Sequence, residues 1–572
     1  MRAELSAKSS AELLGITVGA RPDETLFWSG AGISMDPPTC GPSGDVLVRE
    51  ALRQAFLPCV PETLAYYYRR LRIRGGPAGY KTSPRLETVL EVVEAVHGEV
   101  VLADVLAGLE APPNPLHMFF ASHLALGGQH ITTNFDTCIE RAGAAYPGDA
   151  LLHIHGALGK DVHGATLAGV ERGLSEDVRA RLSDMLLSSQ ITSIVFVGYS
   201  GSDFFDVDPF LASLAPTFLR GRQVLWVDHG RKMEGVAPRR RQLRLLNEAG
   251  AQVREVCMPT RPALQEIGRP WGVSIDDVQG EPQPRRPRIL VREGLQCQAT
   301  IELFALMGLH REVDALLDSR SPHDWEMRAQ TRWVQGRYAE AGAAWELSRV
   351  DASPVARAER AGAVAWIRGE YRRAHDLLTD ALTSGDGSFE ERLTLAETLA
   401  RVYLHMRRSP DSWLLATPQL RAFVLRQLSG PPGVGDAHEP LGTHLGNRIA
   451  SVRSSLGVAP DDSADAVESF GEYEALSAQL NYRQGDLRAR ATRGFVQPDA
   501  FCTLRRDFEA IGADGDAARA VLLGGPLFFS LRELVEATRR LQVTRRQRCR
   551  LLGGSLAYGV LRGIRNSLPL AR

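Results

Sequence analysis

The chain has 572 residues, 44% of them hydrophobic and 24% charged, with a formal net charge of −1. These values predict two to four globular domains of roughly 150 residues each, and they give no general attraction to nucleic acid or to a membrane surface. No apolar run approaches the roughly 18 residues that a membrane span needs, and the 7 cysteines form no Cys-x-x-Cys pair. We therefore expect a cytoplasmic protein without a disulfide framework or a zinc ribbon.

The first strong signal is a short apolar run, Leu26–Trp28, which ends in a glycine turn that begins at Gly30. We expect residues 1–24 to form a lead-in helix and the apolar run to form a buried strand. Glycines after such a strand let the chain turn tightly and let a phosphate approach the backbone, as in doubly wound sheets. The alternative is a purely structural turn. The Gly-x-Gly-x-x-Gly spacing of ordinary dehydrogenases is absent, because Met35 occupies its third position.

Most of residues 45–126 are predicted to be helical, because apolar side chains recur every three to four residues. The predicted helices of this insertion are Val46–Phe56, Glu62–Leu71, Leu86–Val96 and Pro115–Leu126. Further strands are predicted at Gln129–Thr133, Leu151–Ile154, Ile191–Val197, Val224–Val227 and Gln252–Cys257. Helical patterns between several strands, as at Thr137–Ala145 and Val178–Leu187, imply a Rossmann-like parallel α/β sheet with a helical insertion.

Polar residues and glycines follow the predicted strands, at the edge where such sheets bind their ligands. Asn134 can orient a water or a ribose hydroxyl, whereas Asp136 can support positive charge or cap the next helix. His155 follows the third strand and, with an ordinary pKa of about 6.5, suits general-base chemistry. His153 is its rival, and His117 is expected to support the fold. The remaining candidates are the turn Gly198–Asp203 after the fourth strand and Asp228 at the end of the fifth.

Four blocks stand at these strand ends, namely Gly30-Ala-Gly-Ile-Ser34, Thr132-Thr-Asn-Phe-Asp136, His155-Gly156 and Gly198-Tyr-Ser-Gly-Ser-Asp203. In this order they resemble the sirtuin family of NAD-consuming enzymes, and in particular its bacterial defence-associated branch. The resemblance covers about residues 20–260. It implies that NAD is the substrate, that Asn134 and Asp136 lie beside the nicotinamide ribose, and that His155 accepts a proton. The candidate NAD contacts are Gly30, Ala31, Gly32, Ile33, Ser34, Gly198, Ser200, Asp203 and Asp228, and no metal is expected.

The chain departs in two places from the protein deacetylases that it resembles. Those enzymes carry four cysteines between the histidine and the next glycine turn, whereas residues 156–197 contain none. An Asp-Phe-Arg sequence usually follows the first glycine motif, and Pro38–Gly44 stands there instead. Both departures favour hydrolysis of NAD to nicotinamide and ADP-ribose over deacylation or ADP-ribosyl transfer. A module that senses NAD or ADP-ribose without catalysis is the other alternative, although the Asn134 and His155 pair argues against it.

Beyond a proline-rich linker at residues 279–289, the chain reads as helices with an internal repeat. The pattern Trp-x-x-Gly-x-Tyr-x-x-Ala occurs at Trp333–Ala341 and again at Trp366–Ala374, and it resembles degenerate tetratricopeptide repeats. The arginine-rich tail reads as a solvated helix face rather than as a nucleic-acid site. The predicted organisation is a sirtuin-like domain at residues 1–278, helical repeats at 290–430 and a further helical region at 431–572.

The resemblance implies a regulated NAD hydrolase that acts in bacterial anti-phage defence by depleting NAD in abortive infection. Because unchecked loss of NAD would kill the cell, we expect the helical half to restrain the enzyme or to sense a trigger. Helical repeats offer extended surfaces to protein partners. The trigger implied is a phage component or a protein of the same defence system. Homo-oligomerisation fits such systems, although no residue specifies it.

Overall fold

The computed structural model shows two compact units, Met1–Thr300 and Ile301–Arg572. Within the described residues, no helix is both long and apolar enough to cross a membrane. The predicted helix at residues 1–24 and the predicted linker lie almost wholly outside the described residues. These are 21–70, 84–143, 145–159, 162, 164–171, 173–201, 203, 206–228, 236–276, 289, 291–318, 321–348, 353–384, 387, 391–392, 394–396, 398–399, 402, 501–510, 514–524, 529–540 and 552.

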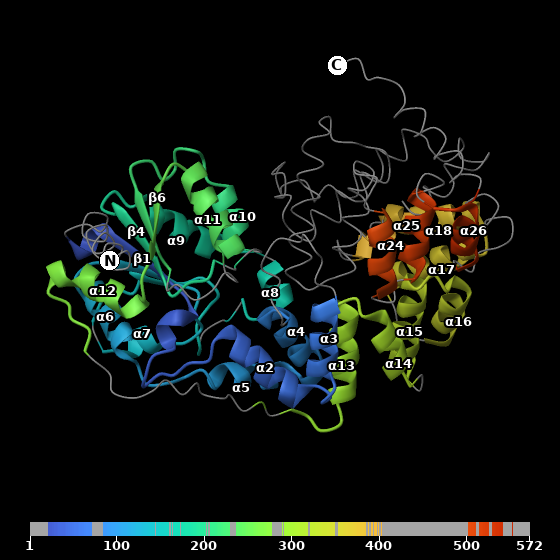
Figure 1. Cartoon of the computed structure of the whole chain (residues 1–572), viewed down its shortest axis with the longest axis horizontal. Helices are drawn as coiled ribbons and strands as arrows, with labels where there is room; N and C mark the ends of the chain where they lie inside the picture. Colours follow the sequence, from blue (N-terminus) through green and yellow to red (C-terminus); the bar gives the residue numbers. More distant parts are fainter. Residues whose placement is uncertain are drawn as a thin grey trace, which may run out of the picture. The chain divides into compact units, whose positions relative to one another are not determined.

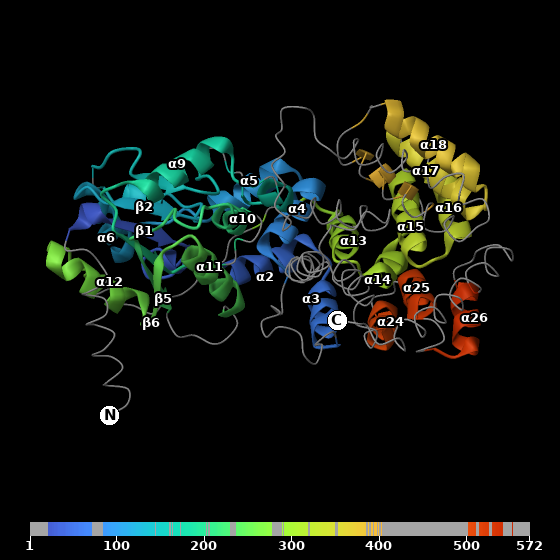
Figure 2. The same cartoon turned by 90° about the horizontal axis from the view of Figure 1, so that it is seen from above.

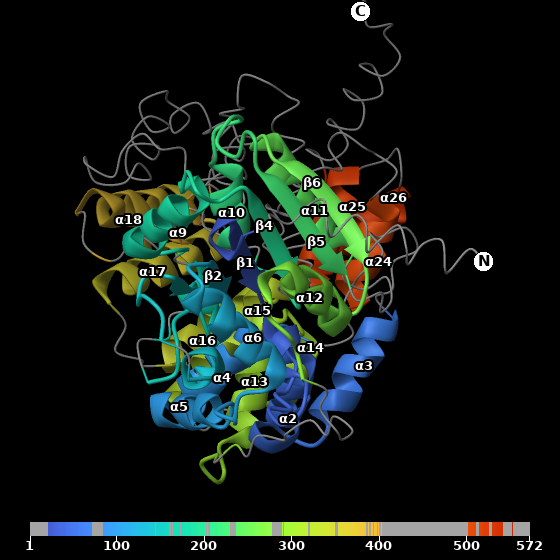
Figure 3. The same cartoon turned by 90° about the vertical axis from the view of Figure 1, so that its left-hand side faces the viewer.

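The first unit is built on a six-stranded sheet with the order β3-β2-β1-β4-β5-β6, whose strands lie side by side in Figure 3. All neighbouring strands are parallel. This is the order of a Rossmann sheet, and it confirms the predicted α/β class. Each predicted strand is present to within two residues. The strands are β1 (Thr25–Ser29), β2 (Gln129–Thr132), β3 (Leu151–His153), β4 (Ser193–Val197), β5 (Gln223–Asp228) and β6 (Gln252–Cys257).

Helices cover both faces of this sheet, which is why its central strands are apolar almost throughout. Figure 1 shows α9, α10 and α11 on one side of the strands and α6 and α12 on the other. The first face holds a stack of Trp28, Phe196 and Trp226, with successive ring centroids 5.1 and 4.6 Å apart. Phe27 points to the second face and packs against α6. The helices are α6 (Pro115–Ala125), α9 (Glu176–Leu187), α10 (Val207–Ala212), α11 (Val236–Glu248) and α12 (Thr260–Gly268).

The predicted helical insertion is present between β1 and β2. Its helices are α2 (Gly44–Ala55), α3 (Val60–Arg70), α4 (Leu86–His97) and α5 (Glu99–Ala107), followed by α6. Helix α5 was not predicted, because it follows α4 across a single residue, Gly98, with a φ of 99°. The helix predicted at Thr137–Ala145 is much shorter, since α7 spans only Cys138–Arg141 and Gly143 then takes a φ of 87°. A short helix, α8 (Leu167–Glu171), precedes α9.

The second unit contains the predicted helical hairpins, and α15 to α18 lie in succession in Figure 2. Gly336 and Gly369 turn the two hairpins with φ values of 77° and 79°. The ring of Trp333 contacts those of Tyr338 and Trp366, with centroids 4.9 and 5.3 Å away, so the repeated aromatics pack together. The helices are α13 (Gln296–Leu306), α14 (His310–Leu316), α15 (Pro322–Val334), α16 (Tyr338–Ser348), α17 (Pro354–Ile367), α18 (Tyr371–Ser384), α24 (Phe501–Ala510), α25 (Asp514–Gly524) and α26 (Leu531–Arg540).

The boundary between the units falls inside α13, after Thr300, rather than in the proline-rich stretch. Hydrogen bonds tie the chain before this point to the first unit. The Ile289 amide donates to Gln54 Oε1 over 2.9 Å, and the Leu57 amide donates to Thr300 Oγ1 over 3.0 Å. The first turn of α13 therefore completes the first unit.

Candidate functional site

The two glycine turns lie at the centre of the sheet, where β1 and β4 are neighbours and the strand order reverses. The Gly32 amide donates a hydrogen bond to the Gly198 carbonyl over 2.9 Å. A Cβ atom on Gly32 would lie 2.7 Å from Gly198 Cα, and one on Gly198 would lie 2.9 Å from the Ile33 nitrogen. Gly198 also has a φ of 61°. Both glycines are thus required because the two turns pack directly on each other.

Ser34 ends the first turn and joins residues from two other parts of the chain, the loop after β2 and the start of α6. Its hydroxyl oxygen lies 3.0 Å from Asn134 Nδ2, 2.8 Å from Asp136 Oδ2 and 3.1 Å from His117 Nε2. The backbone amide of Asn114 donates to His117 Nδ1 over 3.1 Å, so the neutral ring carries its proton on Nε2. The hydroxyl therefore accepts from Asn134 and His117 and donates to Asp136. These three bonds use the full hydrogen-bonding capacity of the hydroxyl.

His117 is more closely tied to this group than the sequence analysis expected. It supports the fold as predicted, since it forms a capping box with Asn114 at the start of α6. Burial lowers its pKa to about 4 despite the nearby Asp136 carboxylate, so the ring is neutral at physiological pH. Its Nε2 also holds Ser34. The signal that could have identified it is the helix start Asn114-Pro-Leu-His117.

The two candidates after β2 lie together at the carboxyl edge of the sheet. Asp136 accepts from the Ser34 hydroxyl and, over 3.2 Å, from the backbone amide of Cys138, the first residue of α7, so it holds the start of α7 and belongs to the Ser34 network. Asn134 reaches Ser34 through its side chain, and its carbonyl lies 2.9 Å from His153 Nδ1. His153 Nε2 lies 3.1 Å from Glu140. Both ring nitrogens of His153, the alternative candidate for the base, therefore hold the loop after β2.

His155, after β3, forms a buried ion pair that the sequence did not reveal. Its Nε2 lies 2.8 Å from Asp206 Oδ2. Burial alone lowers the pKa of His155, but Asp206, with Asp203 and Glu87 beyond it, outweighs burial and raises this pKa to about 9. The imidazole is therefore protonated near neutral pH, in contrast to the expected ordinary value. The spacing Asp203-x-x-Asp206 after the fourth-strand turn was the available signal.

The His155 ion pair lies next to the loop that carries Asn134 and Asp136. The ring centroids of His155 and Phe135 are 6.2 Å apart, and Phe135 is the residue between those two candidates. The Leu158 amide, beyond His155, donates to the Phe135 carbonyl over 2.8 Å. The ends of β2 and β3 are thus held together.

The other candidate NAD contacts have different environments. Ile33 is buried in the core on the second face of the sheet, so the part of this residue that remains for a ligand contact is its backbone. Ala31 and Ser200 are exposed, whereas Gly30 is buried. Asp228 ends β5, where its carbonyl accepts from the Met258 amide. Asp203, in the turn after β4, accepts a hydrogen bond from Tyr199, and burial raises the pKa of its carboxyl.

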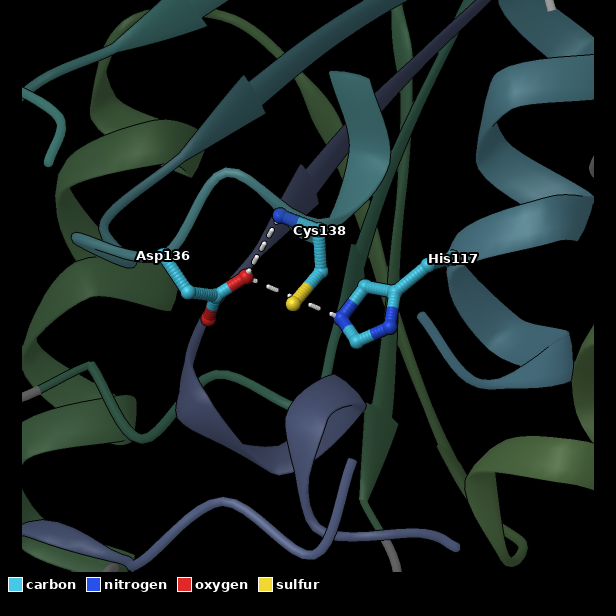
Figure 4. A group of neighbouring side chains, drawn as sticks. All are labelled: His117, Asp136 and Cys138. Atoms are coloured by element: carbon cyan, nitrogen blue, oxygen red, sulfur yellow. Dashed lines mark hydrogen bonds and ion pairs between the residues drawn. The ribbon is translucent and has the colours of Figure 1, made fainter. Parts of the chain in front are cut away.

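Three potential metal ligands meet in the Ser34 network. Figure 4 shows Asp136 and Cys138 turned toward the ring of His117, and one donor atom from each lies within 4.8 Å of the others. Their residue types suit a transition metal. Each atom nevertheless has a partner in the protein, since the Cys138 thiol donates to the Ala111 carbonyl over 3.4 Å and the other two residues bind Ser34. The structure itself accounts for this cluster through hydrogen bonds.

We predict that the Cys138 thiol is unreactive in the folded protein. Burial raises its pKa strongly, and the neighbouring Asp136 carboxylate raises it further, so little thiolate exists at pH 8. Iodoacetamide should label the exposed Cys59 and Cys502 in minutes and leave Cys138 unlabelled until the protein is unfolded. Peptide mass spectrometry measures each site. Rapid labelling of native Cys138 would contradict the buried environment described above.

No protein-family model matches the chain, and no curated protein matches it.

Proposed function

We propose that the first unit hydrolyses NAD to nicotinamide and ADP-ribose. The observation that carries this proposal is the bridge through Ser34, whose hydroxyl joins Asn134 and Asp136 across about a hundred residues of sequence. This bridge lies at the carboxyl edge of a Rossmann-ordered sheet, the usual ligand-binding edge. His155 from the adjacent strand end supplies the titratable group. The same residues carry the resemblance to sirtuins.

The proposed reaction breaks the bond between ribose C1′ and the nicotinamide nitrogen. Nicotinamide leaves with the bonding electron pair, and a water oxygen bonds to the resulting sugar cation. Asn134 orients this water or a ribose hydroxyl, and the Asp136 carboxylate stabilises the positive charge that develops on the sugar. His155 takes the proton released by the water, for which it must first be neutral. The products are nicotinamide, ADP-ribose and one proton.

The resting state of His155 favours a second candidate, a module that binds NAD or ADP-ribose without hydrolysing it. A protonated imidazole paired with Asp206 is a donor, which suits a phosphate or a ribose oxygen better than it suits proton abstraction. A deacylase or an ADP-ribosyltransferase is the remaining alternative. It would need an acceptor peptide, so the assay below includes one.

The proposal extends to biological role. NAD depletion by the first unit would serve bacterial anti-phage defence in the cytoplasm, and the helical hairpins of the second unit would sense a protein trigger or restrain the enzyme. Extended helical repeats are suited to protein partners. Cellular NAD measured before and after phage challenge, with the full chain and with residues 301–572 deleted, tests this role. Identical NAD levels and identical control in both strains would refute it.

Exchanging His155 for glutamine is expected to lower the rate of NAD hydrolysis by roughly 10²–10⁴, the usual contribution of a general base. The full chain is incubated with NAD, with and without an acylated peptide, and the products are identified by mass spectrometry. His323→Gln is the control, since His323 is 51% exposed and, among the described residues, pairs with Glu302. Free ADP-ribose supports hydrolysis, bound but unchanged NAD supports the sensor, and a modified peptide supports transfer.

A further inference from the structure

We propose that Asp206 is the positioning residue of His155, holding the imidazole by Nε2 so that Nδ1 is the atom that receives the substrate proton. The kinetic predictions of this inference rest on the proposed NAD hydrolysis. The pairing of the two side chains can be measured without any turnover.

The carboxylate of Asp206 is fixed at both of its oxygens. Oδ2 lies 2.8 Å from His155 Nε2, and Oδ1 accepts from the Val207 amide over 2.7 Å at the start of α10. The side chains of His155 and Asp206 are only 8% and 4% exposed. A carboxylate held by a helix start on one side can orient a ring on the other, as a third group orients the base in nucleophile–base systems.

This arrangement determines which ring nitrogen is available. An ionised carboxylate only accepts, so Nε2 keeps its proton in both charge states of His155. In the part of the chain that the structure describes, no hydrogen bond is made by Nδ1. The neutral ring therefore presents its lone pair at Nδ1. Asp206 also stabilises the imidazolium that forms after proton transfer, the role that carboxylates have in Ser-His-Asp sites.

Charged groups from two further segments face this pair. Asp203 lies in the turn after β4 that leads to Asp206, and its carboxyl accepts a hydrogen bond from Tyr199. Arg85 and Glu87 come from the start of α4, in the helical insertion, and form an ion pair of 2.8 Å in which Arg85 is largely buried. Arg85 also interacts with the carboxylates of Asp203 and Asp206. The helical insertion thus places charged side chains near the pair of His155 and Asp206.

The pair of His155 and Asp206 makes both the stability of the fold and the rate of hydrolysis depend on pH. Burial lowers the pKa of His155 but Asp206 outweighs it, so the folded pKa is about 9, above the value of about 6.5 in an unfolded chain. The stability that the pair contributes is therefore complete below about pH 6.5 and is lost as the pH rises through about 9. The neutral base appears over the same interval, so hydrolysis should increase with pH up to about 9.

The test is the pH profile of NAD hydrolysis together with NMR titration of ¹³C-labelled histidine in the full chain. In Asp206→Asn the kinetic inflection and the His155 titration should both move down toward about 6.5, because the anion is lost. Its kcat should fall by roughly 10²-fold or more, with little change in KM. Asparagine keeps an oxygen for the Val207 amide, so α10 should still form. Asp206→Glu restores the anion and should restore the high inflection.

Asp208→Asn is the matched control. Asp208 is as buried as Asp206, but its partners are Gln242 at 2.8 Å and Arg241 at 3.0 Å, so the titration of His155 should stay in place. An Asp206→Asn protein whose His155 titrates as in the wild type would overturn this inference, whether or not NAD is consumed. A wild type that shows the high His155 pKa but does not hydrolyse NAD would instead refute the proposed function.

Discussion

Replacing Asn134 by alanine is expected to lower kcat/KM for NAD hydrolysis at least about 100-fold, the effect typical of removing one oriented polar group from an active site. Within the described part of the chain, the carboxamide is held by one side-chain hydrogen bond, to Ser34 at 3.0 Å. Losing one such bond costs about 0.5–1.5 kcal/mol. The first unit should therefore stay folded, and the loss should appear in kcat, because the carboxamide acts on the water or ribose hydroxyl of the reacting sugar.

Two further variants separate chemistry from folding. Asn134→Asp keeps the volume but cannot donate to Ser34 when ionised, so it should be as inactive as the alanine variant. Thr133→Ala lies in the same loop, where the one partner of its hydroxyl among the described residues is the Ser29 carbonyl at 3.5 Å, and it should keep the wild-type rate. Initial rates over a range of NAD concentrations and circular dichroism measure the two quantities. An Asn134→Ala enzyme with wild-type kcat would remove this residue from the mechanism.

The sheet of the first unit was predictable from the sequence because its signals are local. A strand buried on both faces reads as an apolar run, as Leu26–Trp28 and Ile191–Val197 do. A glycine or polar residue after each run marks the edge of the sheet. The helix α5 was not separable from α4, since one glycine with positive φ is the whole connection between them. Local patterns of three to four residues cannot show such a break.

The partners within the site could not be predicted, because they depend on contacts between distant segments. The approach of Ser34 to Asn134 and Asp136 requires the register of β1 against β2, which no short pattern encodes. The pKa of His155 depends on a carboxylate from the turn after β4. An ordinary pKa was expected for this histidine, because the effects of burial and of a nearby charge on its pKa are known only from the folded structure.

Gly32 shows that the glycines of the first turn have a structural cause besides the one predicted from the sequence. Glycines in the first turn were expected to make room for NAD phosphates. The structure gives them another reason, since the backbones of Gly32 and Gly198 touch and share a hydrogen bond of 2.9 Å. Both reasons can hold together, but the packing of one turn on the other applies even without a ligand.

Gly32→Ala is accordingly expected to destabilise the ligand-free protein by about 1–3 kcal/mol or more, the usual cost of overpacking a closed region. The added Cβ would lie 2.7 Å from Gly198 Cα, a backbone atom that cannot move aside as a flexible side chain would. Urea unfolding without NAD measures the change. Gly44→Ala is the control, because nothing lies within 4 Å of a Cβ built there, and it should change stability by less than about 0.5 kcal/mol.

The two outcomes of this experiment separate the two causes. If Gly32→Ala unfolds earlier than Gly44→Ala in the absence of NAD, the glycine is needed to let β1 and β4 end side by side, and weaker NAD binding in that variant follows from a displaced turn. If the ligand-free stability is unchanged and only NAD binding is lost, the glycine serves the phosphates alone. The contact between the Gly32 and Gly198 backbones favours the first outcome. It also means that the position of Ser34, two residues beyond Gly32, depends on how closely the two turns pack.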